Sequence, residues 1–433
     1  MIDEFANHHH DSCVAIILDI ITMTLGRGPC MATEVETIVQ QPAWRALKPV
    51  IGGMLGLVVA MGIGRFAYTP LLPVMQDEFH FSSSFAGMLA SWNYLGYLVG
   101  AILAGWLPGR VHQDLTLRYR FVLAALLGSA AATEMMAFTT AHVLWAVLRG
   151  FGGFFSAGVF VLLSSLMMDW LAAQRQTEKI GFFYAGVGVG IALTGILVPT
   201  FQQYGGWRLG WQGLGIVSLI LTAGVWFTMR RVQVVCLPGQ LPTANAETVP
   251  AAPFHLWGVT FAYGLEGLGY IVMATFITVF FRHVSSVPWL GNVSWILVGL
   301  AAAPSTWLWT KTARAWGWRR AIYAAYIMQA IGVLLPVIWP NIITAVIGSI
   351  LFGGTFMGIA TLALSIGRQC APDRAGRVIG NMTAMFGVGQ AAGPILAGFA
   401  TAATHGYRFS MLISGLILLA AAALLWSARL KAS

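Results

Sequence analysis

The chain has 433 residues, of which 58% are hydrophobic and 9% are charged, whereas a soluble domain carries roughly 25% charged residues. A soluble fold cannot bury that much apolar surface, so the lipid bilayer is the expected solvent for most of the chain. The net charge of +9 does not indicate nucleic acid, because the basic residues lie between apolar segments instead of on one solvated face. The four cysteines lie far apart and predict neither a disulfide framework nor a metal site, and no cofactor is expected.

The N-terminal region differs in composition from the rest of the chain. Its apolar run at residues 14–25 is preceded by acidic residues, whereas a signal peptide begins with positive charge. Met31 starts a polar stretch that leads into the first long apolar segment, so residues 1–30 are expected to be a dispensable extension. Residues 1–44 are therefore predicted to be a disordered cytoplasmic extension, and the three histidines at 8–10 are interpreted as part of a solvated tail, not as a metal site.

Stretches of about 20 apolar residues, the length that crosses a bilayer, recur evenly along the remainder of the chain. They predict an all-α membrane protein with twelve transmembrane helices, divided by a polar cytoplasmic linker at 232–252 into a six-helix half at 45–231 and a second six-helix half at 253–433. The predicted spans are 49–74, 83–107, 119–139, 141–168, 178–200, 207–229, 253–281, 289–310, 319–339, 341–367, 374–401 and 407–428.

The distribution of lysine and arginine predicts the orientation in the membrane, because loops rich in these residues stay on the cytoplasmic side. Most of them fall in the N-terminus, the C-terminus, the central linker and the loops after even-numbered spans. The opposite loops contain only Arg208, Arg282 and Arg408. Both termini are therefore expected in the cytoplasm, with the chain a multi-pass protein of a bacterial inner membrane.

The two halves also resemble each other in sequence at an offset of about 200 residues. Residues 188–197 align without gaps on residues 387–396, and Gly-Trp-Arg at 206–208 then falls on Gly-Tyr-Arg at 406–408. This similarity is typical of a fold that arose by duplication.

At this point the chain resembles the major facilitator superfamily over residues 45–430. The segment Gly62-Ile-Gly-Arg-Phe-Ala-Tyr-Thr-Pro-Leu-Leu-Pro73, followed by Trp92-Asn-Tyr-Leu-Gly-Tyr97, is similar to the YbfB-like (MFS_4-type) bacterial branch. The resemblance implies secondary transport of a small solute by a monomer, with spans 1, 4, 7 and 10 lining a central cavity. The resemblance does not identify a substrate.

Four charged residues lie inside predicted spans, where each costs about 2.5–3.5 kcal/mol at a helix centre and is a functional hypothesis by default. They are Arg65, Glu134, Arg149 and Glu266. The resemblance places all of them except Glu134 near the cavity, and the pattern Arg149-Gly-Phe-Gly-Gly153 matches a fourth-span motif linked to proton coupling in the superfamily. Glu266 is the best candidate proton carrier, because a carboxyl group can bind and release a proton and an arginine cannot. The alternative is that these residues form ion pairs that fix helix packing.

The candidate substrate-binding residues are Arg65, Tyr68, Asn93 and Tyr270. Arg65 suits a carboxylate or phosphate through a bidentate contact. Tyr270 falls opposite it in the repeat and is expected to face the same cavity, as are Tyr68 and Asn93.

The loop between the second and third spans of the superfamily carries acidic and basic residues that latch the cytoplasmic gate. The aspartate expected after Gly100 is missing here. Asp114 and Asp169 are the candidate substitutes, and Asp169, at the inner end of the fourth span, is expected to pair with Arg110 or Arg118.

Several classes of protein are disfavoured by missing motifs. The chain has no Gly-x-x-x-x-Gly-Lys-Ser/Thr loop of an ATP-driven pump, and no His-Glu-x-x-His or Gly-x-Ser-x-Gly motif of an enzyme. Proton-coupled transport of a small organic anion fits Arg65 together with Glu266. The alternatives are proton-antiport efflux of apolar or cationic compounds, which would use Glu266 alone, and a transporter-like sensor that moves no solute.

Overall fold

A computed structural model describes residues 43–108, 111, 114–174, 176–230, 254–284, 287 and 289–429. Within these ranges the chain is built from helices, which confirms the all-α prediction. The long helices are α2 (Ala43–Leu57), α3 (Tyr68–Phe79), α4 (Ser83–Gly105), α6 (Leu115–Met135), α7 (His142–Ala173), α8 (Ile180–Met229), α9 (Leu256–Val284), α10 (Leu290–Trp316), α11 (Trp318–Ile338), α12 (Ile342–Cys370), α13 (Ala375–Thr404) and α14 (Tyr407–Ser427). Eleven helical segments of the described chain are long and apolar enough to cross a membrane. The expected extension at 1–44 and linker at 232–252 lie almost wholly outside the described residues.

The first predicted span is interrupted, although its hydropathy is continuous. The helix α2 runs into a short π-helix, Val58–Ile63, which is followed by a turn at residues 64–67 and then by α3. Pro70 has no backbone N–H to donate to the Phe66 carbonyl, and the N–H of Thr69 donates to Phe66 instead. The Arg65 carbonyl therefore lacks its helical donor and must find a partner on another helix.

The helix α8 spans two predicted segments, 178–200 and 207–229, and bends sharply between them. Gly205 and Gly206 have non-helical backbone angles at this point. Gly206 has φ of +61°, a conformation that glycine adopts at little steric cost. The break thus falls where the sequence analysis predicts the end of one span and the start of the next.

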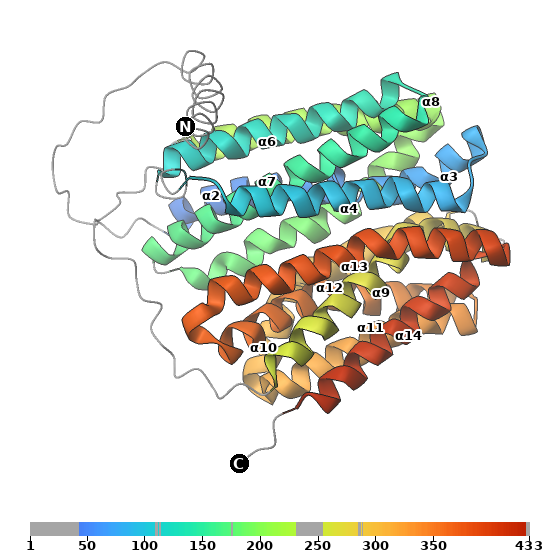
Figure 1. Cartoon of the computed structure of the whole chain (residues 1–433). Coiled ribbons are helices and arrows are strands. Elements are labelled where there is room, and N and C mark those ends of the chain that lie inside the picture. The colour runs from blue at the N-terminus through green and yellow to red at the C-terminus, as the bar shows by residue number, and fades with distance from the viewer. Residues whose placement is uncertain are drawn as a thin grey trace, which may run out of the picture. The chain divides into compact units, whose positions relative to one another are not determined.

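The helices pack through glycine-rich crossings within residues 43–429. Figure 1 shows α2 to α8, in blue to green, beside α9 to α14, in yellow to red, with α4 next to α13. At that crossing Gly87 lies against the backbone of Pro394, and at the crossing of α8 with α10 Gly188 lies against Gly299. Small residues allow such close approach of helices in lipid.

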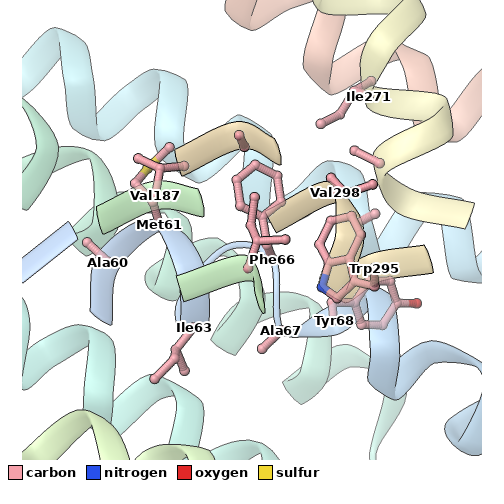
Figure 2. Packing of buried hydrophobic residues seen from close by; sticks show 14 of the residues in the cluster. Ala60, Met61, Ile63, Phe66, Ala67, Tyr68, Val187, Ile271, Trp295 and Val298 are labelled. Atoms are coloured by element: carbon pink, nitrogen blue, oxygen red, sulfur yellow. The ribbon is translucent and has the colours of Figure 1, made fainter. Parts of the chain in front are cut away.

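The buried core next to the interrupted first helix joins several helices. Phe66 contacts the ring of Trp295 edge-on, with ring centroids 6.1 Å apart, and Met61 and Val187 of α8 belong to the same buried cluster (Figure 2). The indole N–H of Trp295 donates to the Thr194 hydroxyl at 3.1 Å. The turn at 64–67 is therefore held between α8 and α10.

Candidate functional site

Arg65 lies on the turn between the π-helix and α3 and is 3% exposed. Its guanidinium carbon is 4.2 Å from the ring centroid of Tyr97 and 4.9 Å from that of Tyr94, both on α4. Its buried Nε and Nη2 atoms have no hydrogen-bond partner, and no carboxylate of the described chain forms an ion pair with it. A buried cation that packs on ring faces and leaves two of its nitrogen atoms without a partner has an incomplete set of contacts.

Arg149 and Asn93 support the turn that carries Arg65. The Arg149 guanidinium donates to the Gly64 carbonyl at 3.5 Å and to the Arg65 carbonyl at 3.3 Å. The Asn93 amide donates to the Gly64 carbonyl at 3.3 Å and to the Arg149 carbonyl at 2.9 Å. These donors replace the ones that the interrupted helix lacks. Both side chains donate to backbone groups in this conformation, and Oδ1 of Asn93 and Nε of Arg149 are buried without a partner.

Tyr68 is also engaged by neighbouring groups. Its hydroxyl donates to the Ala86 carbonyl at 3.1 Å, and its ring faces the guanidinium of Arg149 at 4.9 Å. The structure therefore places Tyr68 beside Arg149, in the support of the turn.

Tyr270 lies in a column of parallel rings. Its ring stacks on Phe356 and Phe386, each with a centroid distance of 5.6 Å, and Phe386 stacks in turn on Tyr263 at 4.4 Å. The Gln390 amide donates to its hydroxyl. The column therefore joins α9, α12 and α13 around Tyr270.

Glu266 is 1% exposed and faces α11. Its Oε1 accepts a hydrogen bond from Nε2 of Gln329 at 2.9 Å, and its Oε2 is buried without a partner. No basic side chain among the described residues pairs with it. The structure therefore does not bring Glu266 and Arg65 into an ion pair.

Glu134 and Asp169 lie away from this centre. Glu134 lies in the last turn of α6, and its buried Oε2, close to Gly215 of α8, has no partner. Asp169 pairs with Arg118 at 2.6 Å, and Arg118 also donates to Ser165 at 3.2 Å. Of the two partners considered for Asp169, the structure shows Arg118, and Arg110 lies outside the described residues.

One end of the site is closed by contacts between α3 and α9. The Thr69 hydroxyl donates to the Ala274 carbonyl at 2.7 Å, and the Thr278 hydroxyl donates to the Thr69 carbonyl at 2.5 Å. Asp77 pairs with Arg282 at 2.6 Å further toward the same end. These contacts join residues about 200 positions apart in sequence.

Two buried glutamines of the site were not predicted, because they carry no charge that marks them in an apolar span. Gln329 and Gln390 lie in apolar spans, where an amide side chain, like that of Asn93, is costly to bury without a hydrogen-bond partner. A signal was available for one of them, because Gln390 replaces Ile191 in the aligned repeat. Within the described ranges no cluster of three His, Cys, Asp or Glu side chains suits a metal ion.

Together the apolar helices, the uncompensated buried arginine and the buried carboxyl are typical of a multi-pass membrane transporter. The chain belongs to the family described as uncharacterised MFS-type transporter YbfB, which matches residues 57–426. This confirms the family resemblance. The family and its solved structural relatives are transporters, in agreement with the expectation of a non-enzymatic protein.

Relatives of known name are distant. The cis,cis-muconate transport protein of Acinetobacter baylyi is 25% identical over 42% of this chain, and the match spans 43% of that relative. The uncharacterized transporter YycB of Bacillus subtilis is 26% identical over 82% of this chain and 87% of its own length. The hexuronate transporter of Bacillus subtilis is 25% identical over 58% of this chain and 63% of its own length.

Solved structures share the fold. The nucleoside transporter NupG superposes with a TM-score of 0.68 at 12% identity, over 88% of this chain and 99% of its own. A bacterial homologue of the human lysosomal transporter Spinster, in an inward-facing and occupied conformation, gives 0.63 at 14% identity, over 90% of this chain and 99% of its own. At these identities the likeness concerns the fold.

Proposed function

We propose that the protein is a proton-coupled secondary transporter of a small organic anion, and that Arg65 binds the anionic group. The observation that carries this proposal is the buried guanidinium of Arg65, two of whose nitrogen atoms have no protein partner. A carboxylate on the solute supplies the missing acceptors and neutralises the charge in one contact. The rings of Tyr94 and Tyr97 hold the guanidinium plane in place, which lowers the entropic cost of forming a bidentate contact.

The remaining site residues divide into two roles in this proposal. Tyr270 lines the solute site opposite Arg65. Asn93, Arg149 and Tyr68 act through the turn at 64–67, whose carbonyl groups and neighbouring rings they hold. This is the packing alternative considered for Arg149, extended to a positioning role for the substrate-binding arginine.

Glu266 is the proposed proton carrier. It is a buried carboxyl with no basic partner in the described chain, so its charge is uncompensated whenever it is ionised. An arabinose-proton symporter of Escherichia coli, 28% identical over 40% of this chain, supports proton coupling, as the muconate and hexuronate transporters support an anionic solute. Glu134 stands as a second, peripheral candidate for the proton path.

The proposed architecture has twelve spans, because the two stretches of α8 on either side of Gly205 each count as one. It retains a cytoplasmic extension at 1–44, six-helix halves at 45–231 and 253–433, and a cytoplasmic linker at 232–252. We place the monomer in the bacterial inner membrane with both termini in the cytoplasm, as the distribution of basic residues predicts.

Ion pairs at the ends of the helices are the proposed gating contacts. Asp77 with Arg282 closes the end formed by α3 and α9. The second proposed gating contact lies at the C-terminal end of α7, where Asp169 pairs with Arg118. Arg110, in the sequence between the second and third spans, is proposed to act with them. Transport then requires these contacts to form and break alternately.

The test is flux into proteoliposomes that contain the purified chain and an internal pH-sensitive dye. Dicarboxylates such as muconate, hexuronates, neutral sugars and cationic dyes are offered as solutes. Arg65→Gln is expected to raise KM for the transported anion about 10- to 150-fold, because hydrogen bonds to charged groups contribute about 1.5–3 kcal/mol. Glu266→Gln is expected to abolish solute-dependent proton movement while anion binding persists.

Arg208→Gln is the matched control, since it removes an exposed arginine that lies on Trp207. It should leave KM and proton coupling unchanged. Transport of cationic dyes with Arg65→Gln unaffected would replace the anion proposal by efflux. Ligand binding without flux in the wild-type protein would indicate a sensor.

A further inference from the structure

Glu266 and Gln329 share one hydrogen bond, and each side chain also has a buried oxygen atom without a partner. The amide Nε2 of Gln329 donates to Oε1 of Glu266 at 2.9 Å. The other carboxyl oxygen, Oε2 of Glu266, and the amide oxygen, Oε1 of Gln329, are both buried and have no partner in the described chain. Burying two acceptor oxygen atoms without a donor costs free energy in an apolar interior.

In the described chain, no other donor and no basic side chain pairs with these two oxygen atoms. The ionisable side chains near Glu266 are Tyr263 and Tyr270 of α9 and Tyr326 of α11. All three are phenols, which are neutral near pH 7. The Tyr326 hydroxyl is already committed to the Ala262 carbonyl at 3.1 Å. Where they are described, the other helices packed on α9, namely α3, α10, α12, α13 and α14, contribute no group that pairs with Glu266.

A proton on Glu266 resolves the mismatch. A protonated carboxyl has one O–H donor and one carbonyl acceptor, and a primary amide offers the reverse set. With the proton on Oε2, this atom donates to the amide oxygen of Gln329 while Nε2 of Gln329 donates to Oε1. Both side chains are then satisfied by each other, and no charge is buried.

We propose that Gln329 is the positioning residue of the proton site, and that it holds Glu266 in its protonated form through a two-hydrogen-bond acid–amide pair between α9 and α11. The inference rests on the proposed function, in which Glu266 carries the proton. On release, the Oε2–H bond breaks, its electron pair stays on Oε2 and the proton passes to water. Ionisation leaves both oxygen atoms buried without a donor, so proton release is coupled to separation of these two helices or to entry of water between them.

Infrared difference spectroscopy of the full chain in lipid tests the pair directly, because a protonated carboxyl has a carbonyl stretching band that an ionised one lacks. At pH 7 we expect a band that disappears in Glu266→Gln and persists in Glu134→Gln, which removes a half-buried carboxyl whose Oε2 has no partner. In Gln329→Leu the band should move to higher wavenumber, since the carbonyl loses its donor. Gln329→Met serves the same purpose if the leucine variant does not fold.

Two results would overturn the inference: no Glu266-dependent band at pH 7, or a band whose position is the same in both Gln329 variants as in the wild type. Flux measured on the same preparations separates this from failure of the proposed function. A band that behaves as expected, with coupled proton flux intact in Glu266→Gln, would refute the coupling role and leave the acid–amide pair standing. As a positioning residue, Gln329 should shift the pH midpoint of transport on substitution and leave KM for the anion unchanged.

Discussion

The carbonyl of Gly64 receives two donors, one from Arg149 and one from Asn93, and this shared acceptor makes a quantitative prediction. Arg149→Met orphans the Arg65 carbonyl but leaves Asn93 on Gly64. With donor distances of 3.3–3.5 Å, we take the lower part of the range for hydrogen bonds to charged groups and expect a loss of about 2 kcal/mol in the free energy of unfolding. Asn93→Ala leaves Arg149 on Gly64 and should cost about 1 kcal/mol.

The double substitution removes both donors of the Gly64 carbonyl at once. A buried, unpaired carbonyl costs about 1–3 kcal/mol, and this penalty is absent from either single variant. We therefore expect the double variant to be less stable than the sum of the singles by about 1–2 kcal/mol.

Reversible unfolding in mixed micelles with increasing mole fraction of denaturing detergent, followed by tryptophan fluorescence, measures these differences. The control cycle combines Arg149→Met with Arg118→Met. Arg149 is a residue of α7, and Arg118 contacts the same helix at Asp169, about 30 Å further along it, so their effects should add. Strict additivity in the Arg149 and Asn93 cycle would refute the shared-acceptor argument. Loss of proton coupling in Arg149→Met without loss of stability would instead assign Arg149 a direct role in turnover.

Two further predictions concern the break in α8 and the closed end of the site. Gly206→Ala should lower the free energy of unfolding by about 1–3 kcal/mol, because a φ of +61° strains a residue with a Cβ. The control Gly105→Ala, in open space on α4, should be neutral or slightly stabilising. Equal effects of the two substitutions would show that the break is not strained. Asp77→Arg or Arg282→Asp should open the α3–α9 end, with a population change of up to about fivefold because the pair is exposed and worth less than about 1 kcal/mol. The double exchange should restore the closed distance between spin labels on the two helices, and failure of that rescue would mean that the pair does not hold the gate.

The candidate site was only partly predictable, for reasons that particular residues illustrate. The intramembrane position of Arg65, Arg149 and Glu266 follows from hydropathy alone, since charge in an apolar span is conspicuous. Their partners do not. Arg149 contacts carbonyl groups 84 and 85 residues away, and Glu266 contacts an amide 63 residues away. An ion pair between Glu266 and an arginine, which the packing alternative would include, does not occur in the described chain.

The sequence by itself determined the solvent, the helical class and the family of this protein, because apolar stretches of bilayer length and the segment 62–73 are local properties of the chain. It also placed the charged residues within the membrane. The tertiary structure alone decided how the first span is interrupted at residues 64–67, which donors satisfy that turn, and that Glu266 faces Gln329 on α11. The physical reason is that the rotation of each helix about its own axis depends on which neighbours it packs against, and hydropathy along one segment carries no information about that choice.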